Sequence, residues 1–529
     1  MTARTRVVVV GAGMVGARFV EELRDRDQGE AFDITLLGAE EYHPYNRVLL
    51  SDLVAGKVSV ASLELPALER PDRRAMQIRR GSSVCRLDRA ARVVQTDDGQ
   101  TYAYDVAVLA TGAGARIPAL EGLQSDARPL PPGVHALRTL DDAREIVAAT
   151  LNAQRAIVVG GGVLGVEAAV GLAGRGLPTT LLHPAPALME RQLDPVASDV
   201  LAARLAVAGV STRVGAATVG VVRESGRLVG VRLDDGTFVA GELVVLCCGT
   251  VAETGLAAEA GLPVGRGIVV GEDLASPADP HVFAIGDCAQ PPEGGTGLVA
   301  QGWDQARRLA AHLVRRAAAS ADPVQPAVDA EPPEDTDVVR VKGTGIDVVT
   351  MGQTACHGHG PEDRVVRLSD PGGHRLVEVV VRGERIVGAT CIGAGQVAVD
   401  LTVAYRRGTP VPADPAHLLL RPVGPAEPSA SPTNMPNSTT VCRCNGVTKG
   451  AIVACYQRGA RSVSEVATAT RATTGCGGCS EVVAGLVDWL RTTDPDGAPG
   501  SASREVPGSR EEAVPSPKPG PHEVETPAA

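Results

Sequence analysis

The sequence predicts an α/β protein with two similar strand–turn–helix units, a small β-rich module and a small helical module that carries cysteines. The two units lie at residues 6–16 and 156–165. Each begins as a short run of β-branched residues, passes through a glycine-rich turn and continues as an apolar helical pattern. A strand, turn and helix of this kind form the basic unit of a parallel sheet, so residues 1–320 are expected to hold two Rossmann-like folds.

The similarity extends to a hairpin in each unit. Asp-Gly pairs at 98–99 and 235–236 lie between two strand-like runs. This dipeptide is typical of type I′ turns, in which both central residues have positive φ. Each hairpin leads into a further apolar run, at 105–110 and 242–247, so we expect the two units to share one plan.

The composition is that of a globular protein, with 44% hydrophobic and 21% charged residues among 529. The formal net charge of −11 argues against a nucleic-acid partner, which would need a basic patch. The apolar stretch 156–173 contains five glycines and Glu167, so it fits a nucleotide-binding unit better than a membrane span. No signal peptide is visible and most of the 11 cysteines are isolated, so we expect a cytoplasmic protein with reduced thiols.

The first glycine-rich turn has the spacing of a dinucleotide-binding fingerprint. Gly11 permits the tight turn, Gly13 lets the backbone approach a pyrophosphate, and Gly16 allows the helix to pack closely on the strand. The amide groups at the start of the helix would hold the phosphates. Glu40 follows the next expected strand, residues 33–37, and is placed to bind ribose hydroxyls.

The second turn repeats this spacing with Gly160, Gly162 and Gly165, and Glu167 follows on the helix. It has the same strand before it and the same helical pattern after it. We therefore predict a second dinucleotide site here.

The strand after the second turn, residues 179–182, ends at His183 and Pro184 rather than at an acid. An acid at this place would favour NAD by binding the ribose 2′-hydroxyl. His183, together with Arg191, could instead lie near a 2′-phosphate, although His183 could equally be a simple surface residue. The choice between NADH and NADPH stays open, with a slight preference for NADPH.

Two further strand ends carry residues suited to a cofactor. Thr111 and Gly112 follow the run 105–110, and Asp287 follows the apolar run 282–285 and a glycine. A carboxylate at such a strand end could hydrogen-bond a polyol chain, although Gly-Asp after a strand is also common in turns.

Four cysteines near the C-terminus form two close pairs. Cys442 and Cys444 are separated by one residue, and Cys476 and Cys479 by two. Four thiolates in this arrangement suit a [2Fe–2S] cluster or a structural zinc ion. Cys455 lies between the pairs on an expected helix and is more typical of a core residue than of a ligand.

Local patterns predict the remaining elements. Thr448 and Ser464 are expected to be the N-caps of two short helices in the cysteine-containing segment. Four β-rich runs indicate a small α/β or β-rich module at 338–405: residues 337–341, 348–351, 376–381 and 386–392.

The order of these motifs resembles that of flavoprotein reductases with two dinucleotide-binding domains. The resemblance covers residues 1–320 and is closest to ferredoxin reductases and to the large subunits of NAD(P)H nitrite reductases. The shared elements are the two glycine-rich turns and the segments 44–51, 110–112 and 285–287. The resemblance implies that the first fold binds FAD and that the inserted fold binds NAD(P)H.

The same resemblance assigns roles to three side chains. It places Arg47 and Glu167 near the isoalloxazine, as candidate catalytic and cofactor-binding residues. It also suggests that Trp303 lies beside the flavin ring, although Trp303 could equally be a core aromatic residue.

The cysteine-containing segment resembles the BFD-like [2Fe–2S] domain, which follows the flavin portion in nitrite reductase large subunits. The matching motifs are Cys-x-Cys-Asn at 442–445, Gly-Ala-Arg at 459–461 and Gly-Cys-Gly-Gly-Cys at 475–479. The resemblance therefore favours a [2Fe–2S] cluster over zinc as the group held by the four cysteines.

The expected domain boundaries follow from these assignments and from composition. The folded parts are a FAD domain in two pieces (1–120 and 245–320), an NAD(P)H domain (121–244), an interface domain (338–420) and the cysteine module (441–491). Residues 321–337 and 421–440 are expected to be linkers, and residues 492–529 a disordered tail, because they are rich in Pro, Ser, Ala, Gly or acidic residues.

The absence of a suitable cysteine pair informs the expected chemistry. Cys247 and Cys248 are adjacent, so they are poorly placed for an ordinary disulfide, and the first 300 residues hold no Cys-x2-Cys or Cys-x4-Cys. We therefore expect hydride to pass directly from nicotinamide to flavin. NAD(P)H gives two electrons at once and a [2Fe–2S] cluster takes one, so FAD is expected to stand between them.

The acceptor is the least determined part of the prediction. No cysteine follows Cys479, so we expect no sirohaem domain in this chain and a separate acceptor protein. The resemblance implies that this acceptor is the catalytic subunit of a nitrate or nitrite reductase. One alternative is a general ferredoxin, rubredoxin or iron-mobilising reductase; another is a non-catalytic redox sensor or scaffold with structural zinc. The sequence leaves open whether the chain forms a homodimer.

Overall fold

The computed structural model confirms the predicted α/β class. It describes residues 4–27, 30–65, 76–123, 129–321, 337–354, 358, 360–419, 435–442, 445–475 and 479–493. Nearly all of the predicted tail, most of both predicted linkers, Cys444 and Cys476 lie outside the described residues, whereas residues 492 and 493 of the predicted tail belong to the last helix. Within them, no helix is long and apolar enough to cross a membrane.

The first Rossmann-like sheet has the strand order β19-β20-β7-β1-β2-β3. Its centre is β1 (Thr5–Val10), which pairs in parallel with β2 (Phe32–Leu37) and β7 (Val106–Leu109). The outer strands are β3 (Met76–Arg79), β20 (Asp279–Ala284) and β19 (Ala275–Ser276). Strands from both ends of residues 1–320 thus form one sheet.

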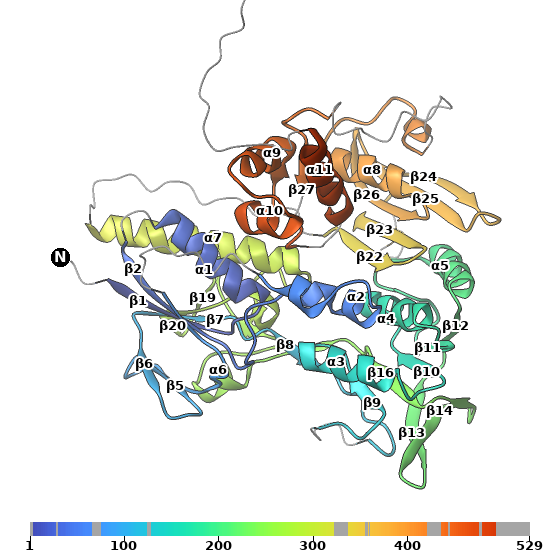
Figure 1. Cartoon of the computed structure of the whole chain (residues 1–529), viewed down its shortest axis with the longest axis horizontal. Coiled ribbons are helices and arrows are strands. Elements are labelled where there is room, and N and C mark those ends of the chain that lie inside the picture. Colours follow the sequence, from blue (N-terminus) through green and yellow to red (C-terminus); the bar gives the residue numbers. More distant parts are fainter. Residues whose placement is uncertain are drawn as a thin grey trace, which may run out of the picture.

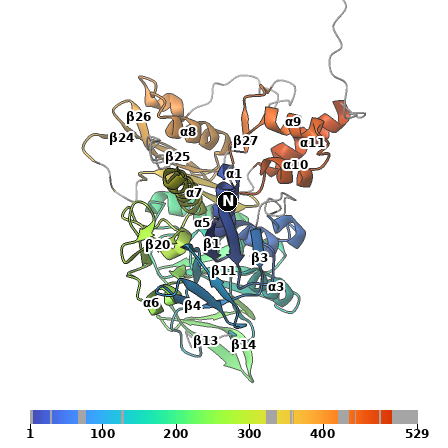
Figure 2. The same ribbon diagram turned by 90° about the vertical axis from the view of Figure 1, so that its left-hand side faces the viewer.

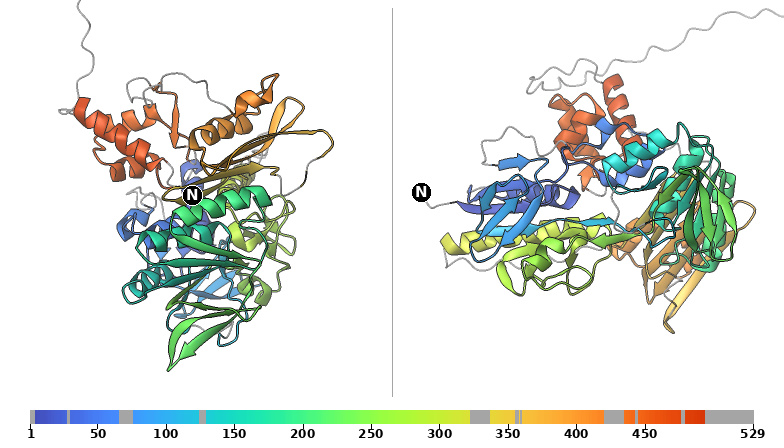
Figure 3. Two further views of the ribbon diagram at one scale, coloured as in Figure 1. Left: turned by 90° about the vertical axis from the view of Figure 1, so that its right-hand side faces the viewer. Right: turned by 90° about the horizontal axis from the view of Figure 1, so that it is seen from below.

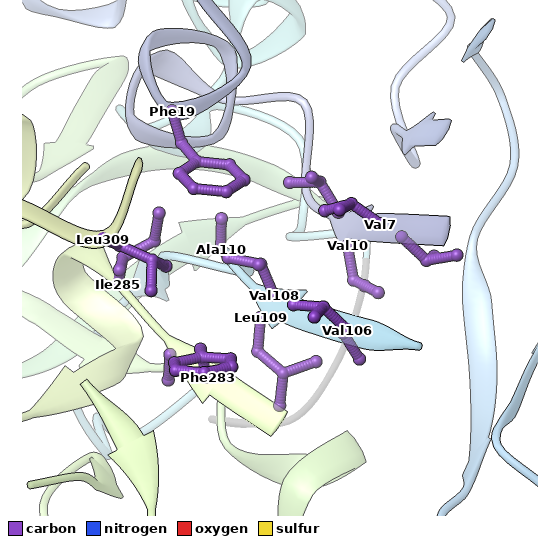
Figure 4. Close-up of a cluster of buried hydrophobic side chains, with 14 of the residues drawn as sticks. Val7, Val10, Phe19, Val106, Val108, Leu109, Ala110, Phe283, Ile285 and Leu309 are labelled. Carbon is purple, nitrogen blue, oxygen red and sulfur yellow. The ribbon is translucent and has the colours of Figure 1, made fainter. Parts of the chain in front are cut away.

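Two helices pack together on this sheet, as Figure 1 shows: α1 (Met14–Arg26) and α7 (Val299–Ala321). The core between helices and sheet is aliphatic with a few aromatic rings. Phe19 of α1, Leu309 of α7 and Phe283 of β20 meet side chains of β1 and β7 there (Figure 4). The four consecutive valines of β1 are all buried, as expected for a central parallel strand.

The second sheet is inserted between two strands of the first and has the order β12-β11-β10-β16-β9. Its strands are all parallel: β9 (Val134–Ala136), β10 (Ala156–Val159), β11 (Thr179–His183), β12 (Val210–Val214) and β16 (Leu243–Leu246). The helices α3 (Leu140–Ala149), α4 (Val163–Gly174) and α5 (Pro195–Val207) pack with it. An antiparallel ribbon of β8 (Ala113–Ala115) and β17 (Thr250–Ala252) joins the two sheets.

Both predicted hairpins are present, but their predicted turn type is wrong. They are β5 (Val93–Thr96) with β6 (Thr101–Ala103), and β14 (Arg227–Leu233) with β15 (Phe238–Ala240). Gly99 and Gly236 have φ of +81° and +83°, whereas neither preceding aspartate has positive φ. The amide of Gly99 donates to the Thr96 carbonyl over 3.0 Å, and that of Gly236 to the Leu233 carbonyl over 3.1 Å. Each loop is therefore a type I turn followed by a left-handed glycine, which needs one residue more than a type I′ turn.

The interface domain is an antiparallel sheet of order β22-β23-β26-β25-β24 covered by α8 (Gly395–Arg407). The four predicted runs correspond to β22 (Val339–Gly343), β23 (Ile346–Gly352), β25 (Arg375–Arg382) and β26 (Arg385–Ile392). The edge strand β24 (Asp363–Asp370) is an additional element, whose charged, half-exposed sequence gives a weak strand pattern. Figure 3 shows this domain against the inserted one, where β22 contacts α4 and β26 contacts α5.

The cysteine module consists of a small ribbon and three short helices. They are β27 (Thr440–Cys442), β28 (Val447–Thr448), α9 (Lys449–Gln457), α10 (Val463–Thr470) and α11 (Ser480–Thr493). Thr448 caps α9 as predicted. The predicted cap Ser464 is wrong, because Ser462 and Glu465 form a capping box that starts α10 two residues earlier. The module lies beside α1, as seen in Figures 1 and 2.

Candidate functional site

A cavity of roughly 1720 Å³ lies where the two Rossmann-like domains, the interface domain and the cysteine module meet. The N-terminal ends of α1 and α4 both point to it, through Gly13 and Met14 on one side and Val163 and Leu164 on the other. Ten of the predicted site residues line it: Gly11, Gly13, Glu40, Arg47, Thr111, Gly112, Glu167, Arg191, Asp287 and Trp303. Its volume exceeds the usual size of a site for one small ligand, so it can accommodate parts of two large cofactors.

The first glycine-rich turn has the shape that a bound pyrophosphate requires. Gly11 has φ of +114°, and a Cβ atom there would lie 2.2 Å from the Ala110 carbonyl oxygen. A Cβ atom on Gly16 would lie 2.0 Å from the Gly11 carbonyl oxygen, so both glycines are fixed by close backbone packing. At Gly13 the nearest atom would be 3.9 Å away, which leaves the start of α1 open to the cavity. The turn therefore fits a dinucleotide phosphate at the helix N-terminus.

The second turn repeats this geometry closely. Gly160 has φ of +116°, with a Cβ atom 2.2 Å from the Cys247 carbonyl oxygen, and a Cβ atom on Gly165 would lie 1.8 Å from the Gly160 carbonyl oxygen. Gly162 has no atom within 4 Å of its Cβ position. The two predicted fingerprints are therefore equivalent in structure, and the second also leaves room for a phosphate.

Glu40 and Arg47 meet at the rim of the first domain. The Arg47 guanidinium forms an ion pair with Glu40 and lies 4.9 Å from the centroid of the Tyr45 ring. The Tyr45 hydroxyl donates to Glu40 over 2.8 Å. The Glu40 carboxylate is thus held by two neighbours beside the cavity, at the end of β2 where a ribose would bind.

Glu167 stands at the junction of three domains. Its carboxylate accepts a hydrogen bond from the Ser51 hydroxyl over 2.6 Å and another from the Lys342 backbone amide over 2.9 Å. The side chain is buried, and this burial raises the pKa of Glu167 even though Lys342 opposes the shift. The residue therefore couples the helix of the second turn to the other two domains and lines the cavity.

Asp287, the candidate ligand for a polyol chain, forms an ion pair in the wall of the cavity. Asp287 accepts a hydrogen bond from the Arg138 guanidinium over 2.8 Å, and both residues line the cavity. The Thr111 hydroxyl donates to the Glu253 carbonyl over 2.8 Å. Trp303 lines the cavity too, with the Arg18 guanidinium 5.7 Å from its ring centroid.

His183 is held by hydrogen bonds to its own domain. Its Nδ1 accepts a hydrogen bond from the Gly161 amide over 3.1 Å, so Nε2 carries the hydrogen and donates to Glu190 over 2.8 Å. The ring is buried, and His183 is not among the described residues that line the cavity, whereas Arg191 is. The histidine thus supports the turn, and of the predicted pair only Arg191 faces the cavity.

Two of the four predicted cluster ligands are described, and they lie together. Cys442 and Cys479 are both buried, and a hydrogen bond from Cys479 lowers the pKa of Cys442 to about 6. The Asn445 amide is 3.8 Å from the Cys442 sulfur. A thiolate is the form that binds iron or zinc, so this donor set fits a metal centre. Cys455 is part of the hydrophobic core of the module, as predicted.

The chain segments next to the other two cysteines contact the first Rossmann-like domain. Asn445, which follows Cys444, accepts a hydrogen bond from Arg18 over 3.1 Å. The Asn46 amide donates to the carbonyl oxygens of Thr474 and Gly475 over 3.1 and 2.5 Å, just before Cys476. Sequence reasoning gave no role to Arg18, Asn46 or Asn445. The two asparagines stand inside motifs that carried the resemblance, and this was the available signal.

Two family models match the chain. One describes the pyridine nucleotide-disulphide oxidoreductases and matches residues 5–308. The other describes the BFD-like [2Fe–2S] binding domain and matches residues 440–489. The second match supports iron–sulfur over zinc for the four cysteines.

Several named proteins are similar to more than half of the chain. Nitrite reductase [NAD(P)H] of Bacillus subtilis is 31% identical over 93% of this chain and 58% of its own length. The assimilatory nitrate reductase electron transfer subunit of the same species is 28% identical over 93% of this chain and 60% of its own length. The chain thus spans little more than half of these relatives. The probable ferredoxin reductase CtmF of Castellaniella defragrans is 36% identical over 54% of this chain and 68% of its own length.

Solved structures agree with this assignment. The ferredoxin reductase for the CYP199A2 system of Rhodopseudomonas palustris has a TM-score of 0.63 at 26% identity, covering 74% of this chain and 91% of its own. Putidaredoxin reductase, in its covalent complex with putidaredoxin, has a TM-score of 0.66 at 26% identity, covering 79% of this chain and 96% of its own. The chain therefore belongs to the pyridine nucleotide-disulphide oxidoreductase family and is an NAD(P)H-dependent flavin oxidoreductase with a C-terminal [2Fe–2S] domain.

Proposed function

We propose that this protein carries electrons from NAD(P)H through FAD and its own [2Fe–2S] cluster to the separate catalytic protein of an assimilatory nitrate or nitrite reductase. Two of the relatives that match 93% of the chain are a nitrite reductase and a nitrate reductase electron transfer subunit. FAD accepts a hydride and releases electrons singly, which suits it to the position between nicotinamide and cluster.

The contact between the cysteine module and the cavity supports this order most directly. Asn445 and Gly475 are the sequence neighbours of Cys444 and Cys476, and they bind Arg18 and Asn46 of the FAD domain. Asn445 also lines the cavity that Gly13 and Trp303 line. The loops that would hold the cluster therefore lie against the proposed flavin site, which favours direct transfer between the two centres.

The residues of the cavity have distinct proposed roles. The starts of α1 and α4 bind the two pyrophosphates, Asp287 binds the ribityl chain, and Arg47 and Glu167 lie by the reacting rings. A thiol relay is not required. Burial raises the pKa of Cys248 to about 11 and that of Cys247 further, so both remain protonated thiols rather than nucleophilic thiolates.

An anaerobic absorbance titration with NADH and, separately, NADPH tests the first half of the proposal. We expect bleaching of the flavin bands followed by loss of the longer-wavelength absorbance of the cluster. The second half is tested by adding the nitrate and nitrite reductase catalytic proteins of the same genome, with product formation as the readout. If the reduced protein supports product formation by neither catalytic protein, the proposed acceptor is wrong.

A second candidate acceptor is a small ferredoxin or rubredoxin. It is favoured by the 36% identity to a probable ferredoxin reductase, the highest among these relatives, although over only 54% of the chain. Rapid reduction of a ferredoxin without any effect on nitrate or nitrite reduction would support this alternative.

A further inference from the structure

The cysteine module is joined to helix α1 by a cluster of charged side chains to which the proposed electron route assigns no role. Arg471 lies at the C-terminal end of α10, and its side chain is only 15% exposed. Its guanidinium is 2.6 Å from Asp25, 3.4 Å from Glu21 and 3.7 Å from Glu22, all on α1. One cation of the module thus faces three acids of the FAD domain.

Glu22, one of these three acids, is kept ionised by its surroundings. Burial of Glu22 opposes its negative charge, but Arg18, Arg26 and Arg471 outweigh this effect and lower its pKa. Arg18 is 2.7 Å from Glu22 and also binds Asn445 of the module. Asp25 is 47% exposed, so the outermost of these ion pairs is open to solvent and to screening by salt.

The same residue also supports the loops beside the cluster ligands. Arg471 has φ of +64°, and its carbonyl oxygen accepts hydrogen bonds from the Asn445 amide over 2.6 Å and from the Thr474 hydroxyl over 2.9 Å. Its side chain therefore holds α1 while its backbone holds both cysteine-bearing segments. A movement of Arg471 away from α1 would carry these segments with it.

We propose that the acidic face of α1 is a docking site for the cysteine module of the same chain, and that Arg471 is the positioning residue that keeps the module docked. The occupant follows from charge complementarity and from the second contact, through Asn46, that anchors the same loops. In the docked position the segments that would hold the cluster lie beside the cavity that would hold the flavin, an arrangement that would allow single electrons to pass between the two groups. The kinetic part of this inference rests on the proposed function; the docking itself does not.

Charge reversal with a matched control tests the docking. Arg471→Glu replaces three attractions by repulsions, whereas Arg458→Glu makes the same change at an exposed position of the same module, at the end of α9. Hydrogen exchange of the nucleotide-free holoprotein is expected to accelerate in residues 14–26 and 44–49 for Arg471→Glu only. Exchange in these segments that is unchanged in Arg471→Glu would overturn the proposal.

Rapid mixing with NAD(P)H provides the second readout. Flavin reduction should be unaffected, whereas cluster reduction should slow about tenfold or more in Arg471→Glu and become insensitive to salt. Asp25→Arg alone should also slow cluster reduction, because it places a second cation opposite Arg471. The double variant Arg471→Glu/Asp25→Arg restores a pair of opposite charges and should recover much of the rate. Failure of this rescue together with normal hydrogen exchange in both single variants would refute docking by charge. If exchange responds as expected but the wild-type cluster never accepts electrons, the docking stands and the proposed function fails.

Discussion

The two glycine-rich turns and the contact between the cysteine module and α1 are stabilised in different ways. The turns are fixed by backbone: Gly11 and Gly160 each place a carbonyl oxygen 2.2 Å from where a side chain would begin. The module is held by side chains, namely Arg471, Asn46 and Asn445, of which Asn445 accepts a hydrogen bond from Arg18. Backbone packing tolerates no replacement, whereas polar side-chain contacts can be weakened step by step. We infer that nucleotide sites should fail abruptly on mutation and that module docking should fail gradually.

The largest expected effect is at the second turn. Gly160→Ala forces a Cβ atom into the Cys247 carbonyl at a φ of +116°, so we expect a loss of more than about 3 kcal/mol of unfolding free energy. Gly162→Ala, which has no atom within 4 Å of its Cβ position, should leave stability within about 0.5 kcal/mol but weaken NAD(P)H binding. Urea denaturation and a nucleotide titration measure the two effects. Equal destabilisation by both variants would contradict the division of roles.

The second prediction concerns the cluster. Cys442→Ser removes a buried thiol that we propose as a cluster ligand, so we expect loss of the long-wavelength absorbance and of electron transfer to the protein acceptor. Flavin reduction by NAD(P)H should stay within about twofold of the wild-type rate, because the variant leaves both turns intact. Cys455→Ser, a buried cysteine of the same module, serves as control and should retain iron. An unchanged transfer rate in Cys442→Ser would remove the cluster from the route.

The third prediction uses the pH dependence of Glu167. Because burial raises its pKa in the folded state, the protonated form is favoured by folding, and stability is lost as pH rises from the ordinary carboxyl range through the raised value. Glu167→Gln removes this dependence and should be the more stable protein at neutral pH, by less than about 2 kcal/mol. Denaturation curves of both proteins between pH 4 and about 8 provide the measurement. A wild-type advantage that grows with pH would show that the charged carboxylate is stabilised instead.

Local sequence patterns predicted the turns, strands and caps that contiguous residues form, and missed the contacts between residues far apart in the sequence. The glycine turns, the strands before them and the cap at Thr448 were predictable, because strand, turn and helix are contiguous in the chain. The type I′ turns and the cap at Ser464 were mispredicted by one or two residues, where neighbouring Asp or Ser residues compete for the same position. The contact of Arg471 with Asp25 joins residues 446 apart, and no periodicity or spacing points to it. His183 was placed correctly on its strand, but its orientation depends on Glu190 and on the Gly161 amide.

The smallest expected effect, a change in the rate of flavin reduction, separates the two functions of Asn46. Its Oδ1 atom accepts from the Val48 amide and starts the turn that carries Arg47, while its Nδ2 group donates to the Thr474 and Gly475 carbonyls. Asn46→Asp keeps the acceptor and loses the donor, whereas Asn46→Ala loses both. The aspartate variant loses both donated hydrogen bonds, each worth about 1 kcal/mol, and sets a negative charge against two carbonyl oxygens, so cluster reduction should slow at least roughly thirtyfold with normal flavin reduction. The alanine variant should in addition slow flavin reduction, because Arg47 is less well placed. Equal flavin reduction in both variants, measured by rapid mixing with NAD(P)H, would mean that the cap does not position Arg47 and that Asn46 serves the docked module alone.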